Sequence, residues 1–346
     1  MRILVTGGAG FIGSNFVRYI LDNYPEDDIL VFDILTYAGD LANLPSLTST
    51  HRLSFIQANI CDEQAVAQAM AGCDAVVHFA AETHVDRSLL SAQDFIATNV
   101  QGTYVLLEAA RKQHMQRFLY ISTDEVYGNA CSPDGMSRPS VETDSLRPLS
   151  PYAASKAGAD TLAFSYWASY GLPVTITRSS NNYGPYQYPE KQLPLFILNA
   201  LEGRPLPIYG DGQHSRDWIH VYDHVAALSV LLHQADSSLD GQIFNIGADQ
   251  ERTTLENAAL ILKSLEKSAE QISFVQDRPG HVRRHAVDTT KIYQQLGWQA
   301  RISFDEGIKQ TIEWYQTHTD WLAGIKEKHN EFLQSALQRG TQPKER

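Results

Sequence analysis

Short apolar runs rich in β-branched residues alternate with longer helical patterns along the first half of the chain. The apolar runs lie at residues 3–5, 29–32, 53–56, 75–79, 118–121 and 174–177. The helical patterns lie at residues 11–23, 62–70, 95–113 and 152–170. Strands that are apolar throughout are buried on both faces, and their alternation with helices is typical of a parallel sheet covered on both sides. The pattern therefore predicts an α/β fold built on a doubly wound parallel sheet of the Rossmann type.

The pattern changes after residue 178, where the elements become shorter and turn-forming residues become frequent. Residues 181–186 (NNYGPY) and 203–207 (GRPLP) are the clearest examples. We therefore expect a smaller mixed α/β lobe that binds the substrate beside one edge of the sheet. The expected division is a nucleotide-binding domain at 1–178 with a return segment at 217–235, a substrate-binding lobe at 179–216 and 236–325, and a polar tail at 326–346.

Composition narrows the possible partners and compartments. The 28 Lys+Arg residues against 40 Asp+Glu residues leave a net charge of −12, which opposes binding to nucleic acid or to an anionic membrane. The three cysteines are odd in number and lack the spacing of a metal site, so we expect no bound metal and a reducing compartment. Because no apolar run approaches the roughly 18 to 20 residues of a membrane helix, a cytoplasmic location is expected.

A glycine-rich stretch, TGGAGFIG at residues 6–13, follows the first predicted strand and opens the first predicted helix. Gly7, Gly10 and Gly13 at such a junction let the backbone approach a pyrophosphate at the helix N-terminus. Asp33 ends the second predicted strand 20 residues after Gly13, where a carboxylate binds the adenosine ribose and repels a 2′-phosphate. The motif predicts a dinucleotide cofactor and favours NAD over NADP.

Tyr152 and Lys156 lie four residues apart at the start of a predicted helix, so their side chains project from one face. A nearby ammonium can stabilise a phenolate and make the phenol a usable base. Taken alone, such a pair is more often two surface residues of a helix. The nucleotide motif upstream favours a catalytic pair instead.

Thr123, Asp124 and Glu125 directly follow the fifth predicted strand. A Thr followed by acidic residues is also a signature of a helix N-terminus, where capping stabilises the helix. Two carboxyl groups beside a hydride-transfer site can, however, have their pKa values separated by burial and mutual repulsion, which gives one acid and one base. In this setting the catalytic interpretation is favoured.

Several cations follow in the second half, beside Tyr186, Tyr188 and Tyr209. Charge pairing and base stacking together suit a nucleoside diphosphate. These cations are Lys191, Arg216, Arg278, Arg283 and Arg284. His84, just after the fourth predicted strand, is interpreted equally well as a substrate contact or as a structural histidine.

Taken together, these motifs resemble the extended short-chain dehydrogenase/reductases, and among them the nucleotide-sugar 4,6-dehydratases, over about residues 1–318. The resemblance rests on TGGAGFIG (6–13), Asp33 with TYAG (36–39), AAETHVDRS (80–88), STDEVYG (122–128), YAASK (152–156), SSNNYGPYQYPEK (179–191), PLPIYGDG (205–212), RDW (216–218) and DRPGH (277–281). Related epimerases and decarboxylases share the glycine turn and the Tyr/Lys pair but usually lack the adjacent Asp-Glu.

The resemblance implies a role for each matching residue. Tyr152 would be the base for the sugar C4 hydroxyl, Asp124 the acid at C6 and Glu125 the base at C5, with Thr123 and Lys156 completing the catalytic set. The implied cofactor shell is Gly7, Gly10, Phe11, Ile12, Gly13, Asp33, Thr36, Asn59, Ile60, Ala80, Ala81, Asn99, Tyr152, Lys156 and Asn182. The implied substrate contacts are Thr83, His84, Thr123, Asn181, Glu190, Lys191, Pro207, Ile208, Tyr209, Arg216, Asp277, Arg278 and His281. Asn59 and Thr254 depart from the family pattern, which often has Asp and Asn there.

The reaction implied is dehydration of dTDP-glucose to dTDP-4-keto-6-deoxyglucose, with NAD regenerated in each cycle. A UDP-glucose 4,6-dehydratase and a UDP-sugar epimerase or decarboxylase stay open as alternatives on the same scaffold, and a catalytically silent NAD-sensing protein is an alternative of another class. The resemblance also implies a homodimer formed through the long helices at 95–113 and 152–170. The apolar residues that suggest this contact are Leu106, Leu107, Leu162, Phe164 and Trp167.

Overall fold

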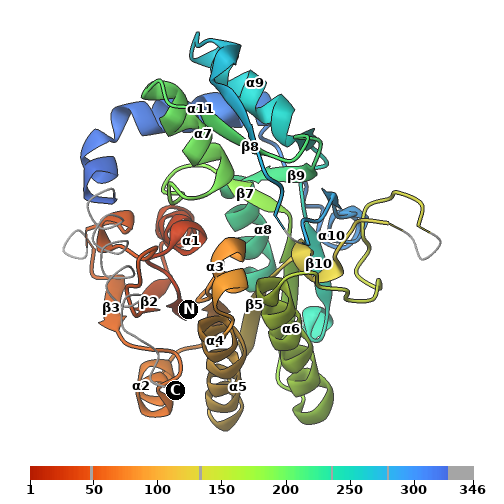
Figure 1. Ribbon diagram of the computed structural model, residues 1–346. Coiled ribbons are helices and arrows are strands. Elements are labelled where there is room, and N and C mark those ends of the chain that lie inside the picture. Colours follow the sequence, from red (N-terminus) through yellow and green to blue (C-terminus); the bar gives the residue numbers. More distant parts are fainter. Residues whose placement is uncertain (47–49, 132–134, 235–236, 279, 326–346) are drawn as a thin grey trace, which may run out of the picture.

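A seven-stranded parallel sheet forms the centre of the larger part of the molecule (Figure 1). The computed structural model describes residues 1–325 apart from 47–49, 132–134, 235–236 and 279, so the expected tail at 326–346 lies outside the described residues. The strands are β1 (Arg2–Thr6), β2 (Asp28–Asp33), β3 (Leu53–Gln57), β4 (Ala75–His78), β5 (Arg117–Thr123), β6 (Val174–Ser179) and β10 (Ile243–Ile246). Their order is β10-β6-β5-β4-β1-β2-β3, which confirms the doubly wound sheet.

Two hydrophobic cores cover the two faces of this sheet, because successive side chains of a strand point to opposite sides. Ile3 and Val5 of β1 belong to one core, and Leu4 between them belongs to the other. The first core includes α1 (Phe11–Asn23) and α8 (Val221–His233). The second includes α2 (Glu63–Met70), α5 (Thr103–Lys112) and α6 (Pro151–Tyr170). The uniformly apolar strands are thus explained by burial on both sides.

The helix expected at 95–113 is divided into three parts. A short α4 (Gln93–Phe95) leads into a π-helical segment, η2 (Ile96–Gly102), before α5 begins. A side chain at Gly102 would lie 2.4 Å from the Ile60 Cδ1 atom, so the helix packs unusually closely there. The Asn99 side chain, in the π-helical segment, accepts a hydrogen bond from the Glu82 amide and donates one to the Glu82 carbonyl. These two bonds fix the position of the loop after β4.

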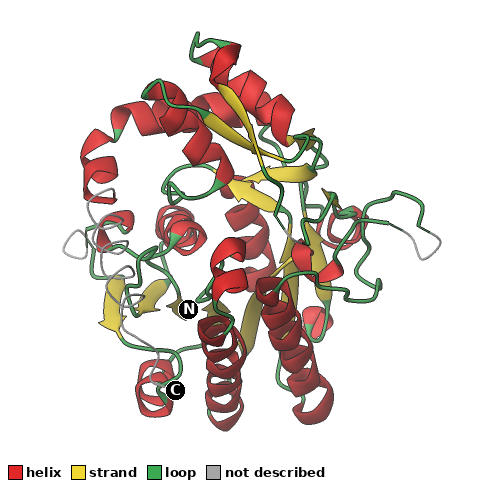
Figure 2. Ribbon diagram, in the orientation of Figure 1, coloured by secondary structure: helices red, strands yellow, loops and turns green. Residues whose placement is uncertain are grey.

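A smaller lobe of mixed strands and helices lies over the carboxyl edge of the sheet (Figure 2). Its strands are β7 (Asn181–Tyr183), β8 (Leu206–Tyr209), β9 (Ser215–His220), β11 (Glu251–Thr253), β12 (Ile272–Val275) and β13 (Arg284–His285). Its helices are α7 (Gln192–Leu201), α9 (Thr254–Ser264) and α11 (Phe304–Thr317). The remaining helices are α3 (Val85–Leu90), α10 (Thr290–Leu296) and the 3₁₀ turns η1 (Leu41–Asn43), η3 (Asp124–Tyr127), η4 (Ser237–Leu239) and η5 (Ala269–Gln271).

The chain returns to the large sheet for longer than the sequence predicts. The expected return segment ends at residue 235, yet β10 pairs with β6 as the outer strand of the large sheet, and α10 packs on β10. The interval 236–325 is therefore not wholly part of the smaller lobe. The four residues of β10 form too short a sequence pattern to be assigned to either sheet from the sequence alone.

Among the described residues, every helix is too short or too polar to span a membrane.

A buried ion pair joins α6 to the large sheet and contributes to the stability of the fold. The Arg178 guanidinium donates to both carboxylate oxygens of Asp160, at 2.8 and 2.9 Å, and both side chains are buried. Asp160→Asn should lower the free energy of unfolding by about 3–5 kcal/mol, because it leaves the Arg178 charge buried without its partner. Urea denaturation without cofactor measures this.

The matched control is Asp305→Asn, which breaks an exposed pair with Arg252. It should change the free energy of unfolding by about 1 kcal/mol or less. Equal losses in the two variants would contradict the assignment of Arg178 and Asp160 as a buried structural pair.

Candidate active site

The turn between β1 and α1 is closed so tightly that two of its positions accept only glycine. Gly7 has a φ of +69°, and a Cβ there would lie 2.5 Å from the Ala80 backbone nitrogen. A Cβ at Gly13 would lie 2.3 Å from the Gly7 carbonyl oxygen. The residue that caps α1 is Gly10, which has no side chain to cover the first amides of the helix. Those amides and the helix dipole make this end a ready site for a phosphate anion.

Asp33 lies at the end of β2, next to this turn. Its carboxylate accepts hydrogen bonds from the backbone amides of Ala9 (3.0 Å) and Leu35 (2.9 Å), so its orientation is fixed. Burial raises the pKa of Asp33, while these two hydrogen bonds lower it. Each oxygen still has a second lone pair, so the carboxylate can accept hydrogen bonds from ribose hydroxyls.

A cavity of about 350 Å³ extends from the glycine turn to the carboxyl end of β5. Five buried polar atoms in its wall have no hydrogen-bond partner among the described residues, so the site fits a large polar ligand. They are Ser122 Oγ, Asp124 Oδ2, Ser180 Oγ, Asn181 Oδ1 and Gln187 Oε1. The residues expected at the cofactor that line the cavity are Gly7, Gly10, Phe11, Ile12, Gly13, Asp33, Thr36, Asn59, Ile60, Ala80, Ala81, Tyr152, Lys156 and Asn182. Asn99 lies outside this lining, because its amide is committed to Glu82 and to Ser155.

The candidate catalytic residues meet at the inner end of this cavity. Thr123 is the last residue of β5, and its hydroxyl accepts from the Glu125 amide at 3.3 Å, so it caps the short η3 turn. The cap is therefore present, and the residues that it positions are still candidates for catalysis. The turn places Asp124 and Glu125 in the cavity wall together with Tyr152 and Lys156 of α6.

The two adjacent carboxyl groups have unequal environments. Burial, and then the Glu125 charge, raise the pKa of Asp124 well above its ordinary value. Burial also raises the pKa of Glu125, but the cations Arg216, Lys191 and Arg278 oppose this rise. Asp124 is therefore favoured as the protonated partner and Glu125 as the ionised one, which is the pattern of an acid beside a base.

Tyr152 and Lys156 are both buried on the first turns of α6. Pro151 and the Ser150 cap start the helix at this point, and the Ser150 hydroxyl accepts from the Ala153 amide. Burial and the Glu125 charge raise the pKa of Tyr152, while a hydrogen bond with Thr123 lowers it. Burial lowers the pKa of Lys156 to about 7. Its Nζ donates to the Ile121 carbonyl at 2.6 Å, which leaves the other protons of a charged amine for a ligand.

A second cavity of about 240 Å³ adjoins the first and reaches into the smaller lobe. Residues that line both cavities connect them; these are Thr83, Glu125, Asn181, Asn182, Gln187, Glu190 and Lys191. The expected substrate contacts found only in the second cavity are His84, Pro207, Tyr209, Arg216, Arg278 and His281. The cations Lys191, Arg216 and Arg278 make this cavity suitable for a diphosphate.

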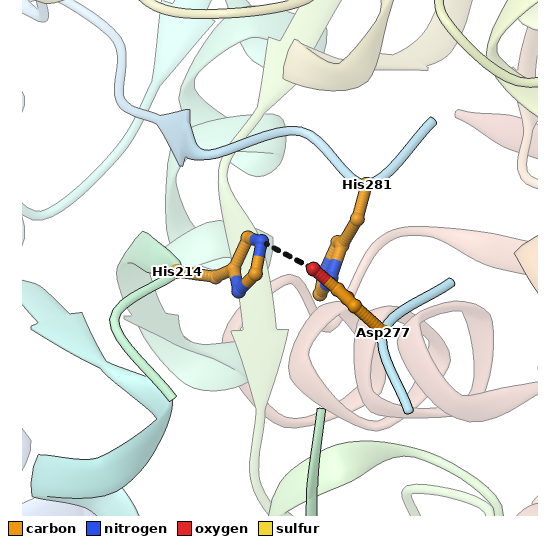
Figure 3. A group of neighbouring side chains, drawn as sticks. All are labelled: His214, Asp277 and His281. Atoms are coloured by element: carbon orange, nitrogen blue, oxygen red, sulfur yellow. Dashed lines mark hydrogen bonds and ion pairs between the residues drawn. The ribbon is translucent and has the colours of Figure 1, made fainter. Parts of the chain in front are cut away.

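Asp277 is absent from the lining of both cavities and lies next to His214 and His281 (Figure 3). His281 Nδ1 is 2.6 Å from one oxygen of Asp277, and His214 Nε2 is 3.4 Å from the other. The ligand atoms of these three residues lie within 4.8 Å of one another, as a metal site would require. The two imidazole rings are, however, stacked 3.7 Å apart at 15°. Ring nitrogens coordinate in the plane of the ring, so near-parallel rings do not converge on one ion, and the group is better described as an orienting network for His281.

Some expected residues lie elsewhere, and some lining residues were not expected. The Ile208 side chain is fully buried in the core of the lobe, and Arg283 and Arg284 pair with Asp211 and Glu251. His84 caps α3 and lies 3.7 Å from Glu190. The unexpected lining residues include Ser180, Gln187, Trp218 and His285. Ser180 and Gln187 lie in the motif at 179–191, and Trp218 lies in the motif at 216–218. His285 lies in none of the motifs, so the sequence did not indicate that it lines a cavity.

Comparison with known proteins identifies the relatives of this chain. The family model described as GDP-mannose 4,6 dehydratase matches residues 4–311. A dTDP-glucose 4,6-dehydratase of Actinoplanes sp. is 45% identical over 93% of this chain and 99% of its own length. The dTDP-glucose 4,6-dehydratase 1 of Escherichia coli strain K12 is 46% identical over 94% of this chain and 96% of its own.

A solved structure matches the fold as well as the sequence. It is DesIV, the dTDP-glucose 4,6-dehydratase from Streptomyces venezuelae, with NAD and TYD bound. Its TM-score is 0.88 at 46% identity, and the match covers 93% of this chain and 98% of that one. The chain therefore belongs to the GDP-mannose 4,6-dehydratase-like family of extended short-chain dehydrogenase/reductases, alongside the dTDP-glucose 4,6-dehydratases that it matches.

Proposed function

We propose that this protein is an NAD-dependent dTDP-glucose 4,6-dehydratase, a hydro-lyase that forms dTDP-4-keto-6-deoxyglucose. The observation that carries this proposal is the adjacent pair of Asp124, which is buried, and Glu125, which is partly buried. Both line the first cavity together with Tyr152, and Glu125 also lines the second. The relatives named as dTDP-glucose 4,6-dehydratases, and DesIV with NAD and TYD bound, support it.

The first cavity would hold NAD. The turn at Gly7, Gly10 and Gly13 suits its pyrophosphate, and Asp33 suits its adenosine ribose, where the negative charge disfavours a 2′-phosphate. Lys156 would bind the nicotinamide ribose with the protons that Ile121 leaves free. When bound, NAD supplies the hydride acceptor for C4 and the hydride donor for C6, so it is regenerated within one cycle.

The residues of this chain move the protons. Tyr152, as the phenolate that the Lys156 ammonium would stabilise, takes the proton of the C4 hydroxyl, so that C4 becomes a ketone when its hydride leaves. The ketone acidifies the C5 proton, which Glu125 removes. Asp124 gives its proton to the C6 oxygen as the C6–O bond breaks, and the product of that step is water. Glu125 returns a proton to C5 when C6 receives its hydride, which completes the 4-keto-6-deoxy sugar. The raised pKa of Asp124 keeps this proton in place until it is needed.

The alternatives use less of this site. An epimerase or a decarboxylase does not expel a C6 oxygen, so its reaction has no step in which a protonated Asp124 would act as an acid. A silent NAD-sensing protein would not need the buried phenol, ammonium and two carboxyls together, each of which costs stability to bury. A UDP-glucose 4,6-dehydratase shares all of these residues and differs only in the base that its second cavity accepts.

We further propose a homodimer that forms through α5 and α6, which pack side by side (Figure 1). Large apolar side chains on these helices and on η2 remain exposed: Ile96 (52%), Tyr104 (43%) and Phe164 (39%). Of the residues first expected at this face, Leu106 and Leu107 instead lie in the core against the sheet, and Leu162 and Trp167 pack partly against that core. A second copy of the same face would remove the exposed apolar area from water.

Substrate choice is tested by incubating the protein separately with dTDP-glucose and UDP-glucose and following loss of one water by mass spectrometry. We expect a kcat/KM for dTDP-glucose about 10- to 200-fold higher than that for UDP-glucose. The difference is modest because the bases differ in the pocket by the methyl group of thymine. Equal or reversed efficiencies would favour the UDP-glucose alternative.

The roles of the phenol and the carboxyls are separated by three variants. Tyr152→Phe should lose about 10² to 10⁴ of rate at the first oxidation, because the base is missing. Asp124→Asn and Glu125→Gln should still oxidise C4 but stall at elimination, so reduced cofactor should accumulate and be visible by fluorescence. Glu125→Gln should also lose exchange of the C5 proton with deuterated solvent. Wild-type rates of dehydration in both carboxyl variants would leave Asp124 and Glu125 with only a structural role.

Assembly is tested by sedimentation at micromolar concentration, where we expect twice the 38.6 kDa mass of the chain. Phe164→Glu combined with Tyr104→Glu should give a monomer, since charges would be buried in the contact. Phe274→Glu is the control, because Phe274 is also an exposed apolar side chain (59%) but lies on β12 of the other lobe. A wild-type protein that sediments as a monomer would contradict the proposal.

A further inference from the structure

Three residues from separate segments meet beside the first cavity, whose lining includes Glu190. Tyr37 follows β2, Arg87 is on α3, and Glu190 precedes α7 of the smaller lobe. The Tyr37 hydroxyl donates to Glu190 Oε1 at 2.9 Å, and Arg87 Nη2 donates to Glu190 Oε2 at 3.0 Å. Both oxygens of Glu190 are thus engaged by protein groups, although the family resemblance implied that Glu190 contacts substrate.

The packing around Tyr37 makes this group rigid. The Arg87 guanidinium lies 3.7 Å from the centre of the Tyr37 ring, and Tyr188 meets the same ring edge-on at 5.4 Å and 84°. The Glu190 side chain is only 9% exposed, so its hydrogen bonds are little screened by water. Burial and the Glu190 charge raise the pKa of Tyr37, so its hydroxyl stays protonated and donates.

The group connects the two sides of the cavity that contains the glycine turn. Thr36, Ala38 and Gly39 line it on one side, and Tyr188 and Glu190 line it on the other. A second tie lies next to the first, since Lys191 Nζ donates to the Thr83 carbonyl at 3.0 Å. Glu190 and Lys191 line the cavity, and their ties connect them to the loops after β2 and β4, so these contacts link segments that surround a ligand held there.

We propose that Tyr37, Arg87 and Glu190 form a clasp that retains NAD in the first cavity throughout the catalytic cycle. The inference rests on the proposed function. In that reaction the hydride taken from C4 must return to C6 of the same sugar. If the reduced cofactor dissociated, the 4-keto intermediate could not be reduced at C6 and the reaction would stop. Slow release is therefore useful to this reaction, whereas a dehydrogenase that exchanges its cofactor in every cycle would be slowed by it. Tyr37 and Arg87 act here as positioning residues.

The test measures how fast NAD leaves the full chain, not activity. Wild-type protein loaded with NAD is separated from free cofactor by rapid gel filtration, and the NAD that remains bound is quantified over time after denaturation. Tyr37→Phe removes only the hydroxyl and keeps the stacked ring. NAD should dissociate about tenfold faster from it, the scale expected when one hydrogen bond to a charged group is lost. Glu190→Gln, which keeps the shape but removes the charge opposite Arg87, should accelerate dissociation as well.

The chain offers a matched control in a second Tyr–Glu–Arg group. The Tyr166 hydroxyl donates to Glu108 Oε1 at 2.7 Å, and Arg111 pairs with the same carboxylate, away from both cavities. Tyr166→Phe should release NAD at the wild-type rate.

The outcomes separate the clasp from the function on which it rests. Faster NAD loss from Tyr37→Phe and Glu190→Gln, with retention in Tyr166→Phe, would support the clasp. Wild-type release rates in Tyr37→Phe and Glu190→Gln would overturn it and leave the group as a structural tie between the lobes. Wild-type protein that binds no NAD would instead overturn the proposed reaction itself.

Discussion

Removal of water from two adjacent carboxyl groups is the constraint on which the rest of this site depends. Asp124 and Glu125 lie at the end of β5 because the Thr123 cap turns the chain there. Burial penalises the charged form of both, and the Glu125 charge penalises the charged form of Asp124 further. Arg216, Lys191 and Arg278 come from the smaller lobe and support the ionised form of Glu125. In the proposed mechanism the lobe therefore contributes to the acid–base chemistry as well as to substrate binding.

The same lobe has a second influence, on the cofactor cavity. Glu190 ties it to the loop after β2 and to α3, and Lys191 ties it to the loop after β4. The two neighbouring residues thus connect the smaller lobe to the other side of the site and also set part of the charge of the cavity lining. Substrate binding in the second cavity and cofactor retention in the first are expected to be coupled through this short segment, because it lines both.

Much of the sheet and of its inner site could be predicted from the chain. The six expected strands of the first half all form, and α1 spans Phe11–Asn23 as its apolar spacing predicts. The sequence predicted the structure less accurately where tertiary packing overrides local sequence preferences. The helix expected at 95–113 contains a π-helical segment where Gly102 packs on Ile60, and β10 joins the large sheet although its four residues carry no mark of that sheet. Propensity is a local property, and neither outcome is decided locally.

The sequence by itself determined which chemical groups are present and which edge of the sheet they reach. The glycine turn, Asp33, the Thr123-Asp124-Glu125 run and the Tyr152/Lys156 pair all follow or flank parallel strands, whose carboxyl ends meet at one edge. Only the tertiary structure decided how those groups behave. It committed Asn99 and Asp277 to neighbouring side chains and backbone, placed the Ile208 side chain in the core, and engaged both oxygens of Glu190. The reason is physical: a residue's identity specifies its donors, acceptors and charge, but burial and the partners across a cavity decide which of them are left for a ligand.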